Sequence, residues 1–347
     1  MNDLLLNHTF AELQELAKTA GQPAYRARQL MEWMYQQRAA SFDELTNLPK
    51  RWRETLEQTT LLNPFRSTTT QVSADQTRKY LFELHDGRFI ESVCIPMKEH
   101  FTLCISTQAG CPLACAFCLT GKQGFFRNLQ PGEILGQILA VQRDAATTSR
   151  ISNIVLMGMG EPLLNYDNVT KAIRLMLAEE GLNFSNRKIT LSTAGIVPGM
   201  EKLGREDFTI NLAVSLNAPN NAIRSQLMPI NNTYPLDMLL DACRRYPLQE
   251  RRRITFEYIL VDQVNDAPEH ARQVADILQG IRCKINLIPL NANPDSPYKP
   301  PSEQTLLAFQ EILAHRGYSA FIRASKGADI SAACGQLSGK YQERTPD

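Results

Sequence analysis

Three closely spaced cysteines are the residues of this sequence best suited to chemistry. Cys111, Cys115 and Cys118 lie in the segment CPLACAFC, with the spacing C-x3-C-x2-C. Thiolates bind iron–sulfur clusters, and three thiolates on a four-iron cluster leave one iron open to another ligand. The spacing therefore predicts a [4Fe–4S] cluster. Zinc or buried structural cysteines are the alternatives, but structural zinc usually takes four ligands and the sequence has no second CxxC or HxxxH pair.

Composition limits the class of protein around this motif. The 347 residues are 43% hydrophobic, enough for a large core, and 37 Lys and Arg balance 36 Asp and Glu to a net charge of +1. A nucleic-acid site must therefore be a local patch. Because the sequence shows no signal peptide and no apolar run of membrane-spanning length, we expect a cytoplasmic protein. In that reducing compartment, eight cysteines favour metal binding or thiol chemistry over disulfides.

The first hundred residues predict two small units. Apolar residues at helical spacing in AELQELAKTA, RARQLMEWMYQQ and RWRETLEQT, separated by GQP and NLP, predict a helical domain over residues 1–63. Residues 64–98 alternate like two strands around Asp86-Gly87, which favours a β-hairpin turn. We expect this hairpin region to link the helical domain to the main domain.

The remainder alternates short apolar strands with helical stretches. Six strands are expected at TLCIST, NIVLMG, KITLST, INLAVSL, ITFEYIL and INLIPL, which predicts an α/β fold with a curved parallel sheet or partial barrel over residues 99–300. Residues 301–347 are expected to form a C-terminal αβ extension that carries a mobile cysteine loop. Reactive groups of such sheets collect at the carboxyl ends of the strands.

Several ordered motifs carry a family resemblance. The cysteine loop, with Phe117 beside its last cysteine, resembles that of the radical SAM superfamily, whose fold is a partial (β/α)6 barrel. The segments GMGEPLLNYDNV, KITLSTAGIVPGM, AVSLNAPNNAIRSQLMPIN, INLIPLN and DISAACGQL narrow the match. Together they resemble RNA adenine methyltransferases of the RlmN/Cfr type, and most closely the RlmN branch that methylates adenine C2 in 23S rRNA. The resemblance implies one [4Fe–4S] cluster and two molecules of S-adenosylmethionine per turnover.

The resemblance also assigns a pocket for S-adenosylmethionine. A carboxylate can pair with an ammonium group, so Glu161, after Gly160 in GMGEP, is the expected contact of the methionyl amino group; alone, GMGEP is equally an ordinary tight turn. Hydroxyl and amide groups at strand ends can instead cap the helices that follow. Asn217 stands where many relatives have histidine. The resemblance places the rest of the pocket at Ser192, Ser215, Leu216, Asn217 and Asn291.

Two further cysteines and a glutamate match catalytic positions of the family. Cys334, in AACGQL, matches the cysteine that carries the methyl group, and Cys104, in TLCIST, matches the cysteine that releases the product by forming a transient disulfide. A disulfide requires their Cα atoms to approach within roughly 7 Å, so the tail must fold back over the barrel. Glu91 corresponds to the proposed proton acceptor, although a glutamate on a strand face is usually solvated. The three other cysteines, Cys94, Cys243 and Cys283, have apolar neighbours and are expected in the core.

The expected substrate is 23S rRNA, with tRNA as a second possibility and a flavodoxin or ferredoxin as electron donor. Basic residues could hold phosphate groups, although solvated helix faces have the same composition; they are Arg26, Arg28, Lys50, Arg51, Arg53 and residues 251–253. Alternatives are C8 methylation as in the Cfr branch, a methylthiotransferase, a glycyl-radical activase and a zinc-binding RNA module. A methylthiotransferase needs cysteines for another cluster, and an activase gives no reason for Cys104 and Cys334.

Overall fold

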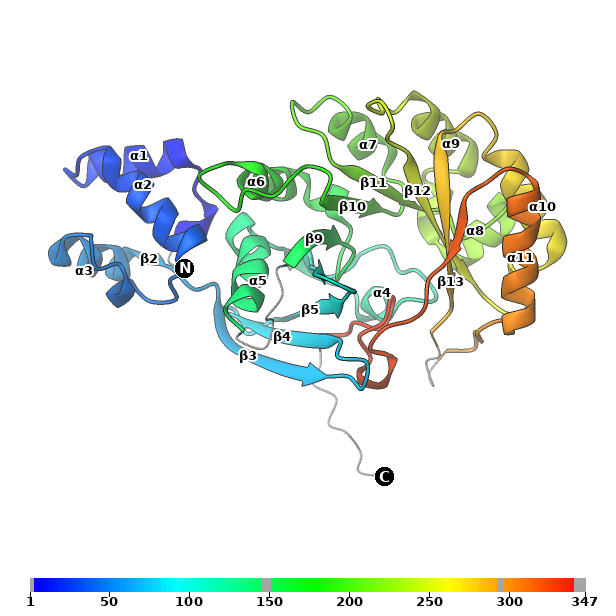
Figure 1. Ribbon diagram of the computed structural model, residues 1–347, viewed down its shortest axis with the longest axis horizontal. Helices are drawn as coiled ribbons and strands as arrows, with labels where there is room; N and C mark the ends of the chain where they lie inside the picture. Colours follow the sequence, from blue (N-terminus) through cyan, green and yellow to red (C-terminus); the bar gives the residue numbers. More distant parts are fainter. Residues whose placement is uncertain (1–2, 145–150, 292–295, 340–347) are drawn as a thin grey trace.

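A single ten-stranded sheet organises the protein in the computed structural model, which describes residues 3–144, 151–291 and 296–339. Its strand order is β14-β13-β12-β11-β10-β9-β6-β5-β4-β3, and all neighbours from β6 to β14 are parallel (Figure 1). The six strands expected from the sequence are β6 (Phe101–Cys104), β9 (Ile151–Leu156), β10 (Ile189–Thr193), β11 (Asn211–Ser215), β12 (Ile254–Leu260) and β13 (Cys283–Pro289). Their order and direction confirm the α/β radical SAM barrel.

Antiparallel strands extend this sheet on one side. The hairpin predicted around Asp86-Gly87 is β4 (Arg78–Leu84) and β5 (Phe89–Pro96), and β5 pairs with β6. Gly87 has a φ of 78°, which glycine adopts without steric cost. Strand β3 (Phe65–Val72), which pairs with β4 at the sheet edge, was not expected from the sequence. Most of β3 is exposed, so it lacks the apolar alternation that marks a strand.

The N-terminal residues form the expected helical unit. Its helices are α1 (Phe10–Thr19), α2 (Tyr25–Met31) and α3 (Lys50–Thr59), and a π-helical turn continues α2. Thr9 and Glu12 form a reciprocal capping box that fixes the start of α1. A short parallel pair, β1 (Asp3–Leu4) with β2 (Thr60–Leu61), closes the unit. Leu13, Leu30 and Trp52 are buried, so each helix contributes to its core.

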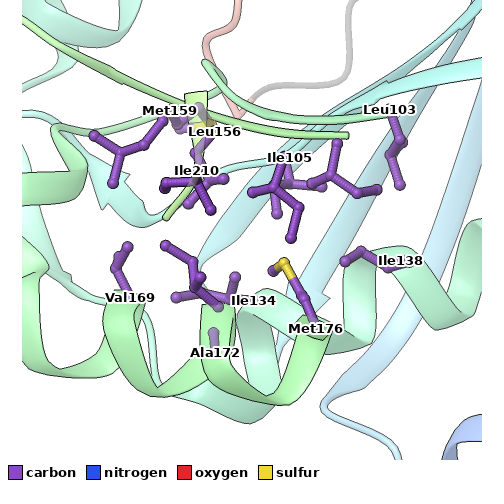
Figure 2. Close-up of a cluster of buried hydrophobic side chains, with 14 of the residues drawn as sticks. Leu103, Ile105, Ile134, Ile138, Leu156, Met159, Val169, Ala172, Met176 and Ile210 are labelled. Carbon is purple, nitrogen blue, oxygen red and sulfur yellow. The ribbon is translucent and has the colours of Figure 1, made fainter. Parts of the chain in front are cut away.

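Helices between the parallel strands cover the outer face of the sheet (Figure 1). Figure 2 shows how Ile134 and Ile138 of α5 (Pro131–Arg143) and Met176 of α6 (Tyr166–Leu177) point toward Leu103 and Leu156 of the sheet. All five side chains are at most 1% exposed. The remaining helices of the layer are α7 (Val197–Leu203), α8 (Asn221–Leu227), α9 (Leu236–Arg245), α10 (Pro268–Ile277) and α11 (Glu303–His315).

The C-terminal residues return to the opposite side of the molecule. After α11 and β14 (Ala320–Ile322), the chain runs back to α4 (Leu119–Gln123) and to the turn between β3 and β4 (Figure 1). The end of the expected C-terminal extension, residues 340–347, lies outside the described residues. Within the part that is described, no helix has both the length and the apolar character that a membrane crossing needs.

Candidate functional site

The cysteine loop is held by backbone hydrogen bonds to two segments and by close packing against a third. It follows β7 (Gln108–Gly110), which pairs with β8 (Phe125–Asn128). The Cys111 amide donates to the Gly124 carbonyl at 2.8 Å, and the Ala116 amide donates to the Leu227 carbonyl of α8 at 2.9 Å. A Cβ on Gly121 would lie 3.0 Å from the Cys115 nitrogen, so α4 packs directly on the loop. The loop therefore has a fixed shape independent of any bound group.

The three thiols lie within mutual electrostatic range inside the barrel. Burial raises the pKa of Cys111 to about 12. A hydrogen bond from the Leu113 amide opposes this rise, and the charges of Cys118 and Glu161 add to it. Burial, followed by the charges of Cys118, Cys111 and Glu161, also raises the pKa of Cys115. None of these cysteines is in a disulfide. Such thiols become thiolates when a cation binds them, which is the donor set that a cluster requires.

The thiols do not form a site for a single ion. Among residues 3–144, 151–291 and 296–339, no three His, Cys, Asp or Glu side chains are arranged to share one metal ion. Each thiolate on a cubane binds a different iron, so its sulfurs need not converge on one point. The loop therefore fits a multi-iron cluster better than tetrahedral zinc.

The GMGEP segment packs against the strand end that precedes the cysteine loop. A Cβ on Gly158 would lie 2.7 Å from the Ile105 carbonyl oxygen, and a Cβ on Gly160 would lie 2.5 Å from Gln108. Gly160 also has a φ of 102°. The Gln108 side chain accepts a hydrogen bond from the Glu161 amide at 2.8 Å. These glycines thus allow the loop to approach its neighbouring strand and set the position of Glu161.

The Glu161 carboxylate is buried and forms no ion pair within the described residues 3–144, 151–291 and 296–339. It is 3% exposed, and it accepts hydrogen bonds from the amides of Leu163 at 3.0 Å and Ala194 at 2.7 Å. Burial raises its pKa to about 7, although these hydrogen bonds oppose the shift. A carboxylate offers about four acceptor positions, so capacity remains for an ammonium group. The residues present therefore fit the amino group of S-adenosylmethionine next to the cluster.

The expected pocket residues lie at neighbouring strand ends, and a buried arginine connects two of these ends. Ser192 and Ser215 end β10 and β11, which pair in parallel. The Arg224 guanidinium of α8 is 0% exposed and donates to the carbonyls of Ala194 at 2.7 Å, Ser215 at 3.1 Å and Leu216 at 3.1 Å. Sequence reasoning missed Arg224, because its acceptors are carbonyl groups that side-chain types do not reveal.

Asn217 and Asn291 face protein partners. The Asn217 backbone is left-handed, with a φ of 55°, and its side-chain oxygen accepts from the Ile259 amide at 2.9 Å. Its carbonyl accepts from the buried side chain of Asn265, a further residue without a sequence signal. Asn291 instead donates to the Cys334 carbonyl at 3.0 Å. Asn217 therefore shapes the pocket wall, and Asn291 contacts the C-terminal segment.

The C-terminal segment brings Cys334 to the interior of the barrel. Cys334 is exposed to solvent. The surrounding protein nevertheless raises the pKa of the Cys334 thiol to about 11, and the charges of Glu257 and Cys118 raise it further by smaller amounts. Burial and then the charge of Cys334 raise the pKa of Cys104. Cys334 thus lies within electrostatic range of Cys104 and Cys118. The other three cysteines, Cys94, Cys243 and Cys283, are buried, which confirms their expected place in the core.

Glu91 is fully buried and not solvated. On β5, one carboxylate oxygen accepts hydrogen bonds from the amides of Ser338 at 2.7 Å and Gly339 at 2.9 Å. The other oxygen lies 3.1 Å from the Lys79 ammonium of β4, as an ion pair without hydrogen-bond geometry. Lys79 is a further residue that sequence reasoning missed.

Comparisons with known proteins agree over the whole chain. Residues 3–62 match the ribosomal RNA large subunit methyltransferase N-terminal domain, and residues 105–275 match the radical SAM superfamily. A dual-specificity RNA methyltransferase RlmN of Syntrophus aciditrophicus is 55% identical over 332 residues, which cover 96% of this chain and 95% of that protein. The chain belongs to the RlmN family. The RlmN of Geobacter sulfurreducens is 49% identical over 335 residues, covering 96% and 92% of the two chains.

A solved structure extends this assignment to the fold. The crystal structure of a radical SAM methyltransferase from Sphaerobacter thermophilus has a TM-score of 0.95 and 44% identity, and the match covers 97% of this chain and 100% of that one. As a member of the RlmN family, the protein is a radical SAM RNA methyltransferase that uses a [4Fe–4S] cluster and S-adenosylmethionine. The family resemblance drawn from the motifs is confirmed.

The basic residues of the N-terminal unit fall into two groups. The guanidinium groups of Arg26 and Arg53 donate to backbone carbonyls, Arg26 to Asn47 at 2.6 Å and Arg53 to Asp43 at 3.0 Å. They stabilise the unit itself. Arg28, Lys50 and Arg51 are exposed, and Lys50 lies 3.9 Å from the Glu54 carboxylate. Within this unit, Arg28 and Arg51 are therefore better placed than Arg26 and Arg53 to contact RNA.

Proposed function

We propose that this RlmN-family enzyme methylates C2 of an adenosine in 23S rRNA and of an adenosine in the tRNA anticodon loop. The names of its relatives, dual-specificity RNA methyltransferases, support two RNA substrates. Adenine C2 is a poor nucleophile and cannot displace a sulfonium methyl group directly. The observation that carries the proposal is that the segment of Cys334 lies against the cluster loop, where the Leu119 amide, directly after Cys118, donates to the Gly335 carbonyl at 2.8 Å. Methylation of a ring carbon through a cysteine carrier needs that carrier beside the cluster.

Cys111, Cys115 and Cys118 would hold the cluster, and the pocket for S-adenosylmethionine would be formed at the neighbouring strand ends. A bound cluster supplies the electron that cleaves S-adenosylmethionine to a 5′-deoxyadenosyl radical, and a flavodoxin or ferredoxin in the cytoplasm would deliver that electron. Glu161 would bind the amino group, because its buried carboxylate needs a cation. The remaining contacts of the cofactor would come from Gly160, Ser192, Ser215, Leu216, Asn217 and Asn291.

The two flanking cysteines would perform the group transfer. The Cys334 thiolate attacks the methyl carbon of a first S-adenosylmethionine, and S-adenosylhomocysteine leaves with the electron pair of the broken bond. The 5′-deoxyadenosyl radical would take a hydrogen atom from the S-methyl group and leave as 5′-deoxyadenosine, and the remaining carbon radical would bond to adenine C2. Once the adduct has returned one electron to the oxidised cluster and given up the C2 proton to Glu91, Cys104 attacks the Cys334 sulfur. A disulfide forms, the sulfur–carbon bond breaks, and the released carbon takes a proton to become the methyl group.

Glu91 would accept the C2 proton. In the conformation described here its carboxylate is 0% exposed and both oxygens have partners. Proton transfer from an adenine ring therefore requires the Ser338–Gly339 segment to leave. To act as a base, Glu91 must therefore first lose its contacts with the Ser338–Gly339 segment.

Substitution of each cysteine tests the transfer. Cys104→Ala, incubated with reconstituted cluster, S-adenosylmethionine, reductant and RNA, should accumulate a covalent protein–RNA adduct detectable by denaturing electrophoresis. Cys334→Ala should form no adduct, because the methyl carrier is missing. An adduct that persists in Cys334→Ala would refute the carrier assignment.

The position of the methyl group is read from the RNA. Nucleoside mass spectrometry of 23S rRNA and tRNA treated with the wild-type enzyme should give 2-methyladenosine in both. Product only at C8 would assign the protein to Cfr-type chemistry instead. Product in only one RNA would remove the second substrate from the proposal.

A further inference from the structure

The buried Lys79–Glu91 pair forms a receptor for the backbone of the C-terminal segment. The Ser338 and Gly339 amides both point at one oxygen of Glu91, at 2.7 and 2.9 Å, and Lys79 lies at the other oxygen, at 3.1 Å. Lys79 is 3% exposed and Glu91 is 0% exposed. Burial of a carboxylate is costly unless a charged partner and hydrogen-bond donors compensate for the lost water. Lys79 supplies the charge, and the tail supplies the donors.

The tail residues are shaped for this receptor. Gly339 has a φ of 61°, a left-handed conformation that favours glycine, and a Cβ there would lie 3.0 Å from the Phe89 carbonyl oxygen. The adjacent Leu337 is buried, and its carbonyl accepts from the Thr120 hydroxyl at 2.7 Å. The segment thus makes a close backbone contact on both sides of Ser338. Main-chain recognition of this kind fixes where a chain lies, independently of its side chains.

Ser338, the first residue bound by this receptor, lies four residues beyond Cys334. Further contacts hold the chain on both sides of Cys334. The Gly335 carbonyl accepts from the Leu119 amide at 2.8 Å, directly after the last cysteine of the cluster loop. Upstream, the Asp329 carboxylate accepts from the Ser73 hydroxyl at 2.5 Å and the Ala74 amide at 3.1 Å. Cys334 therefore lies between two contact points that both involve a carboxylate, Asp329 on one side and Glu91 on the other.

We propose that Lys79 and Glu91 are positioning residues that hold the Cys334 segment beside the cluster loop for methyl transfer from S-adenosylmethionine to Cys334. The inference rests on the proposed function. The same oxygen of Glu91 cannot accept both tail amides and the C2 proton of adenine. Docking of the tail and proton acceptance are therefore successive states, and Lys79, 3.1 Å from the other oxygen, holds the Glu91 carboxylate in place for both.

The test measures methylation of Cys334 alone, before any radical step. Reconstituted holoenzyme is incubated with methyl-labelled S-adenosylmethionine, without RNA or reductant, and Cys334 is quantified by peptide mass spectrometry. Ser338→Pro removes one tail amide without touching Glu91, whereas the matched control Ser338→Ala keeps it. Because a hydrogen bond to a charged group is lost, we expect Ser338→Pro to lower the methylation rate about tenfold and Ser338→Ala to leave it unchanged.

Lys79→Met should also lower the rate, since it leaves Glu91 buried without its cation. The double variant Lys79→Met/Glu91→Gln should recover part of the rate, because a neutral amide oxygen can still accept the tail amides. Iron content and reductive formation of 5′-deoxyadenosine report the cluster separately, and in Ser338→Pro, Ser338→Ala and Lys79→Met both should stay at wild-type levels.

The outcomes separate this inference from the proposed function. If wild-type Cys334 is methylated and Ser338→Pro is methylated equally fast, the docking role is wrong while the carrier role stands. If wild-type enzyme places no methyl group on Cys334, the carrier role itself fails. A Lys79→Met variant with full cluster and an unchanged methylation rate would equally overturn the positioning role of Lys79.

Discussion

The cluster loop and the C-terminal segment both present cysteines to the barrel interior, but they are held in different ways. The loop lies between a β-ladder, α4 and α8, and its backbone contacts come from regular elements. The C-terminal segment is held largely by side chains reaching its backbone, from Glu91, Thr120 and Asn291. Regular elements cannot move without losing their own hydrogen bonds, whereas side-chain anchors can be released singly.

This difference matches the demands on each cysteine. The cluster ligands must keep one geometry, whereas Cys334 must meet S-adenosylmethionine, then RNA, then Cys104. A buried cation supports each region: Arg224 donates to carbonyls behind the pocket, and Lys79 pairs with the carboxylate that accepts from the Ser338 and Gly339 amides. Arg224 thus stabilises a fixed wall, and Lys79 stabilises a docking site.

The largest effect is expected from the fixed loop. Cys115→Ala should reduce formation of 5′-deoxyadenosine from S-adenosylmethionine to background, because a cluster ligand is lost. Chromatographic measurement with a chemical reductant checks this without RNA. The matched control is Cys283→Ala, a buried cysteine of β13, which should keep its iron and its cleavage activity. Wild-type cleavage by Cys115→Ala would show that Cys115 is not a ligand.

The second prediction concerns the fixed wall. Arg224→Met should lower the free energy of unfolding by about 3–5 kcal/mol, since several buried carbonyl groups lose their only charged donor. Burial lowers the pKa of Arg224 to about 10, because it disfavours the charged guanidinium. The desolvation of this charge therefore offsets part of the stability that its hydrogen bonds supply. Urea unfolding monitored by circular dichroism measures the change. A loss below 1 kcal/mol would mean that water replaces the guanidinium and that the wall is less rigid than its contacts imply.

Several features of the two regions could be predicted from the sequence, because they depend only on residues that are close together in the chain. The six parallel strands, the Asp86-Gly87 hairpin and the helical unit follow from periodicity and turn residues. The spacing of Cys111, Cys115 and Cys118 likewise lies within one loop. Glu161 follows from the GMGEP motif together with its place after a strand.

The remaining features depend on contacts between distant segments. Lys79 and Glu91 read as ordinary alternating residues of a hairpin, and only the return of Ser338 and Gly339 makes them a receptor. Arg224 lies in a polar-looking helix, and its burial arises from carbonyls of three other segments. β3 is stabilised by pairing with β4 and not by an apolar face of its own. None of these partners can be inferred from neighbouring sequence.

Two glycines near the cluster loop test whether close packing there matters for stability and for binding of S-adenosylmethionine. Gly160→Ala should weaken binding of S-adenosylmethionine and cost about 2–3 kcal/mol of stability, because its φ of 102° is strained for alanine and its Cβ would lie 2.5 Å from Gln108. Gly124→Ala is the control, since its φ of 83° is also positive but no atom lies within 4 Å of a Cβ. Thermal unfolding and titration with S-adenosylmethionine should show the smaller loss for Gly124→Ala. Equal losses would mean that backbone strain alone matters.

The smallest effect is expected far from both cysteine regions, in the N-terminal unit. Arg28→Gln and Arg51→Gln remove exposed charges, so each should weaken RNA binding modestly and reduce the slope of log affinity against log salt by about 1. Filter binding at several salt concentrations measures this. Arg26→Gln is the informative contrast, since Arg26 donates to the Asn47 carbonyl and should cost stability before it changes the salt slope. Unchanged slopes in both exposed variants would place the RNA contact elsewhere and leave the barrel opening as its main surface.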